Sequence, residues 1–216
     1  MRSRTSTLAR LVATVTALTG AATGGLVALG AAPASAACSP VEVVAARGTF
    51  EPGRLGVIVG DPVFKALQGR FPKKKLSAHP VDYPADASPT SPRKGVQALV
   101  KHVTKQARAC PKQKFVLVGY SQGAMVVTGA LGGAVGGGTK LPKNTHAKIA
   151  AILLFGNPNR MAGKSGVAKK FAGRTLDICK KGDPVCGGGT NMAAHLAYRS
   201  DADRAARFAA EKIRKR

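Results

Sequence analysis

The sequence is poor in acidic and aromatic residues and contains no tryptophan. Its 216 residues include 10 Asp and Glu against 34 Lys and Arg, and aromatic residues make up 5% of the chain. The scarcity of aromatics and the lack of a nucleic-acid-binding motif argue against a nucleic-acid-binding protein. The four cysteines form no C-x-x-C pair, which argues against a structural zinc site. The glycine-rich stretch 132–139 lacks the Lys-Ser/Thr ending of a phosphate loop. We expect no metal and no cofactor.

The first 36 residues have the pattern of a secretory signal peptide. Residues 1–10 carry three arginines, and the uncharged run 11–37 that follows contains the A-x-A sequence Ala34-Ser35-Ala36. We therefore expect residues 1–36 to be removed, leaving residues 37–216 as a single secreted domain with a substantial core. Because the uncharged run is long enough to span a bilayer, a retained membrane anchor is the alternative. The cleavage site and the high Ala, Gly and Thr content favour removal.

Four cysteines, Cys38, Cys110, Cys179 and Cys186, follow the expected cleavage site. An even number of cysteines behind a signal peptide indicates two disulfides formed in an oxidising compartment. Three connectivities are open. The short spacing of Cys179 and Cys186 makes a local bridge the natural one, and Cys38 would then join Cys110 at the end of a helix. Lipid attachment to Cys38 is disfavoured, because Ser35 stands where a lipoprotein signal has leucine and an odd number of cysteines would be left.

Basic residues are spread along the whole chain and give it a formal charge of +24 at pH 7. Without the three arginines of the predicted signal peptide, the mature chain carries +21. A secreted protein of this charge is attracted to anionic cell-wall polymers or to lipid head groups. The alternative is that the charge serves solubility alone.

The hydrophobic pattern predicts strands that alternate with helices. Apolar runs typical of buried strands occur at Val41–Ala46, Leu76–Tyr83, Phe115–Val118, Lys148–Phe155 and Arg174–Cys179. Apolar residues recur with helical spacing over Leu55–Arg70, from Ser91-Pro92 to Cys110, and over Asp201–Ile213. Pro62 indicates a helix start inside the first of these. In the second, Ser91 is expected to be the residue just before the helix, with Pro92 at the first helical position. Because parallel strands need crossover connections, this order predicts a three-layer α/β fold with a central, mainly parallel sheet.

The central motif is Gly119-Tyr120-Ser121-Gln122-Gly123, a G-x-S-x-G sequence. It follows an apolar run and precedes small, helix-compatible residues, which is the strand, turn and helix order that a nucleophile elbow requires. Ser121 would then stand at the carboxyl end of a buried strand, and the Gln122 N–H at the helix start could face a developing oxyanion. Such a short pattern can arise by chance in a chain with 26 glycines, but the flanking strand and helix argue against chance.

Chain order selects the partners of Ser121. In α/β-hydrolases the acid follows the serine and the histidine follows the acid. Between Ser121 and His195 the only acidic residues are Asp177 and Asp183, and His195 is the only histidine that follows either of them. Asp183 is favoured because it lies just past a predicted strand, between two cysteines that can form a bridge. Asp177 lies inside the strand and is the alternative acid.

These residue types predict acyl-transfer chemistry. Ser121 is a weak nucleophile until a base takes its proton. His195 can take that proton and deliver it to the leaving alkoxide, while Asp183 fixes the imidazole tautomer and stabilises the imidazolium. A second oxyanion donor should come from the loop after the first strand, where Thr49 can offer its N–H and hydroxyl. A hydroxyl that only caps the turn is the alternative for Thr49.

Several parts of the chain together resemble the cutinase family of α/β-hydrolases. They are Cys38, Ala46–Glu51, Val81–Ala85, Gly119–Ala124, Phe155–Pro158, Cys179–Cys186 and His195–Tyr198. The resemblance covers nearly the whole mature chain and implies a central five-stranded parallel sheet with helices on both faces. The residues to which it implies a role are the triad Ser121, Asp183 and His195, the oxyanion donors Thr49 and Gln122, and the disulfides Cys38–Cys110 and Cys179–Cys186.

The resemblance implies a secreted serine esterase, free of cofactor, that acts on cutin-like polyesters and on short- to medium-chain acyl esters. Acetylxylan esterases and phospholipases or lipases of the same fold are alternatives. A basic protein that binds cell walls or membranes is the alternative from another class. We expect a monomer whose partners are the ester substrate and, through its charge, an anionic polymer or membrane surface.

Two features depart from the family pattern. Asn157 stands where the family commonly has Asp, which should affect local structure rather than the triad. The strongly basic surface is the second departure, and it weakens the case for a neutral plant polymer as substrate. Near His195, the residues Met192, Leu196 and Val185 could form an apolar rim for an acyl chain, with ordinary packing as the alternative.

Overall fold

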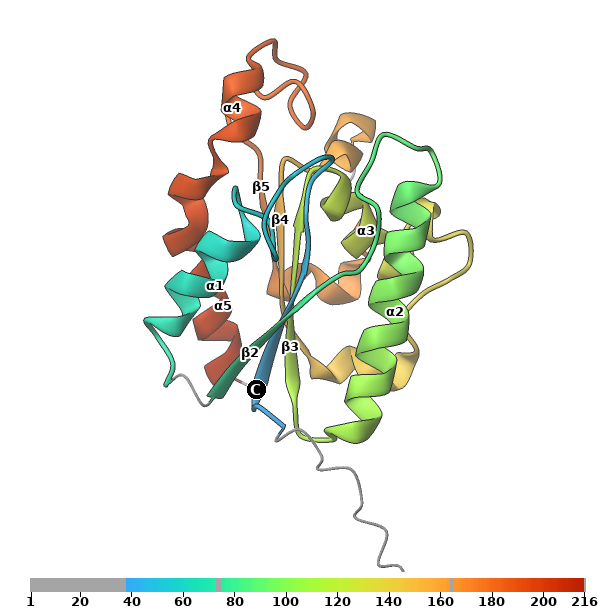
Figure 1. Cartoon of the computed structure of the whole chain (residues 1–216), viewed down its shortest axis with the longest axis vertical. Coiled ribbons are helices and arrows are strands. Elements are labelled where there is room, and N and C mark those ends of the chain that lie inside the picture. Colours follow the sequence, from blue (N-terminus) through green and yellow to red (C-terminus); the bar gives the residue numbers. More distant parts are fainter. Residues whose placement is uncertain (1–37, 73–74, 164, 216) are drawn as a thin grey trace, which may run out of the picture. The chain divides into compact units, whose positions relative to one another are not determined.

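The computed structural model describes residues 38–72, 75–163 and 165–215. The predicted signal peptide lies outside these residues. The centre of the described chain is a five-stranded, all-parallel sheet with strand order β2-β1-β3-β4-β5 (Figure 1). Its strands are β1 Val41–Ala46, β2 Leu76–Pro80, β3 Lys114–Tyr120, β4 Ile149–Phe155 and β5 Thr175–Ile178.

Helices cover both faces of the sheet. α2 (Ser91–Ala109) and α3 (Gln122–Ala130) pack on one face, and α1 (Gly60–Gln68) and α5 (Ala202–Arg214) pack on the other (Figure 1). The short α4 (Met192–Leu196) follows β5. Short 3₁₀ helices occur at η2 Ala134–Gly136, η3 Lys143–Lys148, η4 Pro158–Ala162, η5 Lys169–Arg174 and η6 Tyr198–Asp201. This architecture confirms the predicted three-layer α/β fold.

The three inner strands, β1, β3 and β4, are buried on both faces because each of their two side-chain rows packs against a helix layer. Val44 and Leu117 belong to the core under α2 and α3, whereas their chain neighbours Val43 and Val116 belong to the core under α1 and α5. β4 is apolar and buried along its whole length, as expected for a strand covered on both sides. The connections that follow β3 and β4 therefore begin at firmly packed backbone.

The helix expected over Leu55–Arg70 begins only at Gly60. Before it the chain makes turns, with positive φ angles at Gly53 and Gly56. The buried carboxylate of Glu51 accepts a hydrogen bond from the Ile58 N–H at 2.7 Å, which fixes this turning segment. Pro62 therefore predicts the start of α1 better than the apolar spacing does, since Pro62 lies in the first turn of this helix.

Two further boundaries differ from expectation. β2 ends at Pro80, where its pairing with β1 ends, rather than at Tyr83. The residue that precedes the first turn of α2 is Thr90 rather than Ser91, although Pro92 lies in that turn as predicted. The Ser91 hydroxyl instead donates a hydrogen bond to the side chain of Gln122, so it serves the loop beside the G-x-S-x-G turn.

Two disulfides, Cys38–Cys110 and Cys179–Cys186, are present. This is the connectivity that the spacing favoured. The first joins the segment before β1 to the C-terminal end of α2, and the second closes a short loop after β5. Within the described ranges, no helix has the length and apolar character needed to cross a bilayer.

Candidate active site

Ser121 lies in a sharp turn between the end of β3 and the start of α3. Its φ of 52° and ψ of −117° are unusual for a residue with a side chain. The Ser121 N–H donates to the Phe155 carbonyl at 2.9 Å, which ties the turn to the end of β4. A Cβ atom at Gly123 would lie 1.9 Å from the Ala46 carbonyl oxygen, and one at Gly119 would lie 2.5 Å from that of Gly123. The two glycines are therefore required by close backbone approach.

The structure brings Ser121, His195 and Asp183 together. His195 Nε2 lies 3.0 Å from Ser121 Oγ, and His195 Nδ1 lies 2.8 Å from Asp183 Oδ2. Asp183 is fully buried, and His195 is 6% exposed. Because a carboxylate can only accept at Nδ1–H, the neutral imidazole is left with Nε2 as an acceptor for the Ser121 hydroxyl.

Three donors hold the Asp183 carboxylate. The Tyr198 hydroxyl donates to Oδ2 at 2.5 Å, in addition to His195, and the Val185 N–H donates to Oδ1 at 2.7 Å. Burial raises the pKa of Asp183, but the hydrogen bonds from Tyr198, His195 and Val185 outweigh it and leave that pKa below its ordinary value. The group is therefore a carboxylate at neutral pH. Tyr198 in turn accepts a hydrogen bond from the Lys180 N–H at 3.0 Å.

The backbone of His195 is also fixed. The Tyr120 hydroxyl donates to the His195 carbonyl at 2.8 Å, and the Tyr120 ring lies 5.1 Å from the imidazole, centre to centre. Tyr120 is the residue just before Ser121, so the strand that presents the hydroxyl also positions the histidine. The sequence pattern gave no sign of this contact, since the second residue of a G-x-S-x-G motif is variable.

The two expected oxyanion donors, Gln122 and Thr49, lie on elements that meet beside Ser121. Gln122 is the first residue of α3, where backbone N–H groups have no partner within the helix. Its side chain bridges two segments, accepting from the Ser91 hydroxyl at 3.0 Å and donating to the Asp86 carbonyl at 2.8 Å. Thr49 is exposed in the turn after β1. Whether these N–H groups bind an oxyanion stays a prediction.

A buried carboxylate fixes the turn that contains Thr49. Glu51 Oε2 accepts from the Gly48 N–H at 2.6 Å, and the Phe50 N–H donates to the Ala85 carbonyl at 2.7 Å. Burial raises the pKa of Glu51 above its ordinary value, although the hydrogen bonds from Gly48 and Ile58 oppose this shift. Glu51 was among the residues that carry the family resemblance, but no pattern assigned it this role.

The alternative acid, Asp177, belongs to a different network. Its Oδ2 accepts from Asn157 Nδ2 at 3.1 Å and lies 3.8 Å from Arg160. Among the described residues, Asp183 is the carboxylate that contacts His195. Asn157 also donates to the Ser165 carbonyl, so the amide stabilises the β4–η4 connection and offers a donor to Asp177. An Asp at 157 would place a second carboxylate there.

Cys179, Asp183 and Cys186 form the only group of three metal-ligand side chains found within the described ranges. The two sulfurs are joined to each other, so neither is available as a thiolate. Asp183 is bound by its three donors. These residues therefore do not have the donor set of a metal site.

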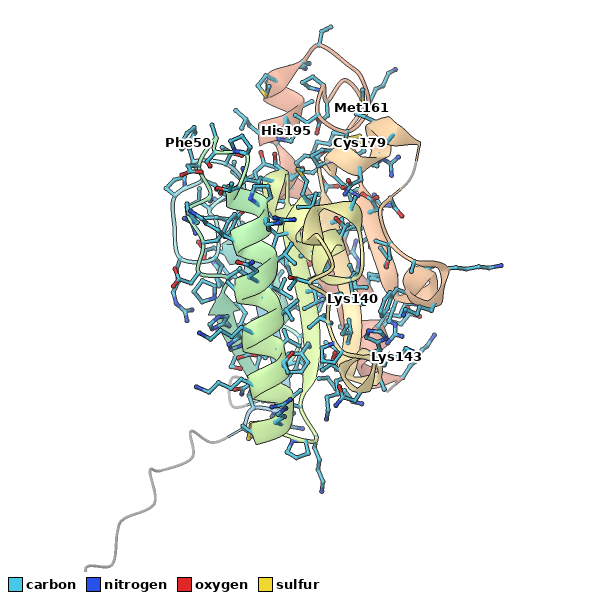
Figure 2. The ribbon with its side chains drawn as sticks, turned by 90° about the vertical axis from the view of Figure 1, so that its right-hand side faces the viewer. Phe50, Lys140, Lys143, Met161, Cys179 and His195 are labelled. Carbon is cyan, nitrogen blue, oxygen red and sulfur yellow. A yellow bond between two sulfur atoms is a disulfide. The ribbon has the colours of Figure 1, made fainter. Side chains whose placement is uncertain are left out.

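Exposed large apolar side chains lie on the two segments that carry Thr49 and His195. Phe50 is 74% exposed, Leu196 56% and Met192 53%. Figure 2 shows Phe50, His195 and Met161 at one end of the sheet. Phe50 comes from the turn after β1, and Met192 and Leu196 come from α4, so apolar surface approaches Ser121 from two sides. This surface is defined here as the apolar rim.

Comparisons with known proteins show the family to which the chain is related. Residues 37–213 match the sequence model of the family Cutinase. A cutinase of Kineococcus radiotolerans is 40% identical over 188 residues, which cover 83% of this chain and 64% of that protein. Phospholipase Culp4 of Mycobacterium tuberculosis is 39% identical over 218 residues, which cover 98% and 96%. The structure of Trichoderma reesei cutinase with a phosphonate inhibitor has a TM-score of 0.67 at 35% identity, covering 82% and 77%.

The parallel sheet, the turn at Ser121 and these matches define the class as α/β-hydrolases that cleave carboxylic esters. Within that class, the chain belongs to the cutinase family. It spans 64% of the length of the Kineococcus relative and nearly all of the mycobacterial one.

Proposed function

We propose that this protein is a secreted serine esterase that hydrolyses carboxylic esters through an acyl-enzyme. The observation that carries the proposal is the continuous hydrogen-bonded series from Asp183 through His195 to Ser121, with distances of 2.8 and 3.0 Å. Each link has the geometry that proton transfer from the hydroxyl requires. The expected leader and the two disulfides support secretion.

In the proposed first step, Ser121 Oγ attacks the ester carbonyl carbon while His195 Nε2 takes its proton. The tetrahedral intermediate carries its negative charge on the former carbonyl oxygen, which the N–H groups of Gln122 and Thr49 stabilise. His195 then gives the proton to the leaving alkoxide, and the acyl group remains on Ser121. In the second step His195 takes a proton from water as the water oxygen attacks the acyl carbon. The second tetrahedral intermediate then collapses, the bond to Ser121 Oγ breaks, His195 returns the proton to Ser121 Oγ, and the acid is released. Asp183 stays ionised throughout.

The apolar rim favours an acyl chain over a purely carbohydrate substrate. Phe50, Met192 and Leu196 can cover methylene groups on either side of the ester, at roughly 0.8 kcal/mol for each group buried. We therefore propose short- to medium-chain acyl esters as substrates. A phospholipid is the second candidate, because the protein with the longest match described above is named a phospholipase.

The test compares p-nitrophenyl esters from acetate to palmitate, using the mature protein, Ser121→Ala, and Ser77→Ala as a matched serine control at the far end of β2. We expect turnover that is highest between butyrate and octanoate, is lost in Ser121→Ala and persists in Ser77→Ala. Turnover of acetate alone would identify a deacetylase, and release of fatty acid from phosphatidylcholine micelles would identify a phospholipase. Equal turnover by the wild type and Ser121→Ala would overturn the proposed mechanism.

A further inference from the structure

One side of α2 is a continuous row of positive charge. Lys94, Lys101, Lys105 and Arg108 are all exposed, and at 100° per residue they fall within an arc of about 60°. The row is about 21 Å long, at 1.5 Å per residue. α2 contains no acidic residue. Among the described residues, none of these four side chains forms an ion pair.

The row borders a hollow between α2 and the end of the edge strand β2. This hollow has a volume of about 470 Å³ and is lined by Lys94, Lys101 and Lys105 from the helix together with His79, His102 and Asp82. A second, shallow hollow is lined by α2 residues alone, among them Lys101, Lys105 and Arg108. The four basic residues and these hollows are called the α2 groove. Its charge is spread over nearly four turns of helix, at about 3.6 residues per turn, so the groove is suited to an extended ligand.

The imidazoles in the α2 groove are already arranged. The His79 and His102 rings are stacked with centres 3.3 Å apart, and His102 Nε2 lies 2.9 Å from the buried Glu42 carboxylate. The His102 imidazole is therefore bound to Glu42, whereas His79 lines the hollow. Burial and the neighbouring His102 lower the pKa of His79, so at neutral pH this imidazole is neutral and can donate one N–H. Asp82 is the one carboxylate of the lining. Ammonium groups and an imidazole N–H are donors that suit phosphate oxygens.

The direction of the α2 groove distinguishes between anionic partners. α2 runs alongside the strands, whereas the apolar rim lies at the end of the sheet where Phe50 and His195 are found (Figure 2). A flat membrane that contacts the rim cannot also lie along this helix. No Phe, Tyr or Trp side chain lines the groove, and its two imidazole rings are stacked on each other. The large aromatic faces on which nucleic-acid bases stack are thus not among its lining. A flexible linear chain of phosphate groups fits both the charge and the direction.

We propose that the α2 groove binds a linear phosphate-bearing polymer, such as a chain of phosphodiesters without bases. The polymer lies along Lys94, Lys101, Lys105 and Arg108, and it leaves the mouth at Ser121 open. The protein is thereby held on an anionic matrix while its active site remains free for substrate. This inference is independent of the proposed esterase activity, because it uses none of the residues of that site.

The test measures binding of the mature protein to long-chain inorganic polyphosphate. Lys101→Glu/Lys105→Glu should weaken binding about 10-fold or more. The plot of the logarithm of the binding constant against the logarithm of salt concentration should become less steep, by about 1–2. Lys65→Glu/Arg204→Glu is the matched control, since it removes the same charge from exposed positions of α1 and α5 on the opposite face. We expect this control to bind within about 2-fold of the wild type.

Equal weakening in both double variants would overturn the inference, since net charge alone would then explain binding. It would also be overturned if the α2 variant lost binding to phosphatidylglycerol vesicles but kept its affinity for polyphosphate, because the partner would then be a membrane. Ser121→Ala should bind polyphosphate like the wild type, and both double variants should hydrolyse soluble esters normally. These two readouts separate failure of the α2 groove from failure of the esterase mechanism.

Discussion

Ser121 has a backbone conformation that costs free energy in any residue with a Cβ. At φ 52° and ψ −117° that cost is about 1–3 kcal/mol, and it is compensated by the packed ends of β3 and β4. Glycine tolerates a positive φ, so we predict that Ser121→Gly is more stable than Ser121→Ala, with a free energy of unfolding about 1 kcal/mol larger. Both variants should be inactive. Urea denaturation at neutral pH measures the difference. A Gly variant less stable than the Ala variant would contradict the strain.

Tyr198 is predicted to act by positioning Asp183. Tyr198→Phe removes one charge-assisted hydrogen bond, so we expect kcat to fall about 10-fold with little change in KM. The lowered pKa of Asp183 means that its carboxylate stabilises the fold above its ordinary pKa of 3.8, and this contribution is lost as pH falls through the lower folded value. The stability lost on replacing Tyr198 should therefore be largest above about pH 4 and shrink in more acidic solution.

Tyr120→Phe is the matched control for that experiment. It also removes one tyrosine hydroxyl beside His195, but its partner is a backbone carbonyl rather than Asp183. We expect its effect on the free energy of unfolding to be independent of pH between about 2 and 6, because no carboxylate loses a bond. A pH dependence equal to that of Tyr198→Phe would show that the assignment to Asp183 is wrong.

At the residue scale, the sequence indicated more of the candidate site than of the residues that support it. Ser121, Asp183 and His195 could be found because a spaced motif and the order of three residue types leave few choices. Tyr198 and Glu51 could not be assigned roles in the same way. Their functions come from hydrogen bonds across the fold, and a buried tyrosine hydroxyl or glutamate has no periodic pattern that reveals its partner.

Among the elements, the turn after β1 depends on the buried Glu51. Its raised pKa means that the native state binds the proton more tightly than the unfolded chain, so stability falls as pH rises from 4.5 through the folded value. Glu51→Gln lacks this titration. We predict that the stability of the wild type relative to Glu51→Gln decreases over that interval and is constant above it, as measured by urea denaturation.

Glu51→Gln should also affect catalysis. The amide has one acceptor oxygen in place of two, so either the Gly48 or the Ile58 N–H loses its partner. A looser turn presents Thr49 less accurately, and kcat should fall while KM changes little, because oxyanion contacts form in the transition state. An unchanged kcat would show that Thr49 does not stabilise the oxyanion.

The two disulfides should separate stability from activity. The bridge Cys38–Cys110 spans 72 positions and its loss should cost about 4 kcal/mol, whereas loss of Cys179–Cys186, seven positions apart, should cost about 2.5 kcal/mol. Only the shorter loop contains Asp183. We therefore predict that paired Ser replacements at 179 and 186 lower kcat more than those at 38 and 110, in assays at a temperature where both proteins are folded.

Element boundaries were less predictable than element order. The order of strands and helices followed from apolar runs, since buried strands and amphipathic helices have distinct periods. The start of α1 at Gly60 depended on Glu51 binding the Ile58 N–H, which is a contact between side chain and backbone. β2 ends at Pro80 because its pairing with β1 ends there, opposite Ala45. Neither is a property of the local sequence alone.

For the whole molecule, self-repulsion should make stability sensitive to salt. The full chain carries a formal charge of +24, and it would carry +21 without the three arginines of the predicted leader. A charge of this size opposes the compact state. We predict that raising NaCl from about 10 to about 200 mM increases the free energy of unfolding by about 1 kcal/mol, because screening shortens the range of repulsion. Thermal denaturation of Lys65→Glu/Arg204→Glu is the control, and its salt response should be smaller.

The bridge between Cys38 and Cys110 lies where the segment before β1 meets the C-terminal end of α2. Ser121 stands at the other end of β3, across the full length of the parallel sheet. Anything joined ahead of residue 38 is thus attached on the side remote from the substrate. A carrier protein, an affinity tag or a solid support coupled there would keep the hydrolytic end facing outward, so oriented immobilisation requires no redesign of the enzyme.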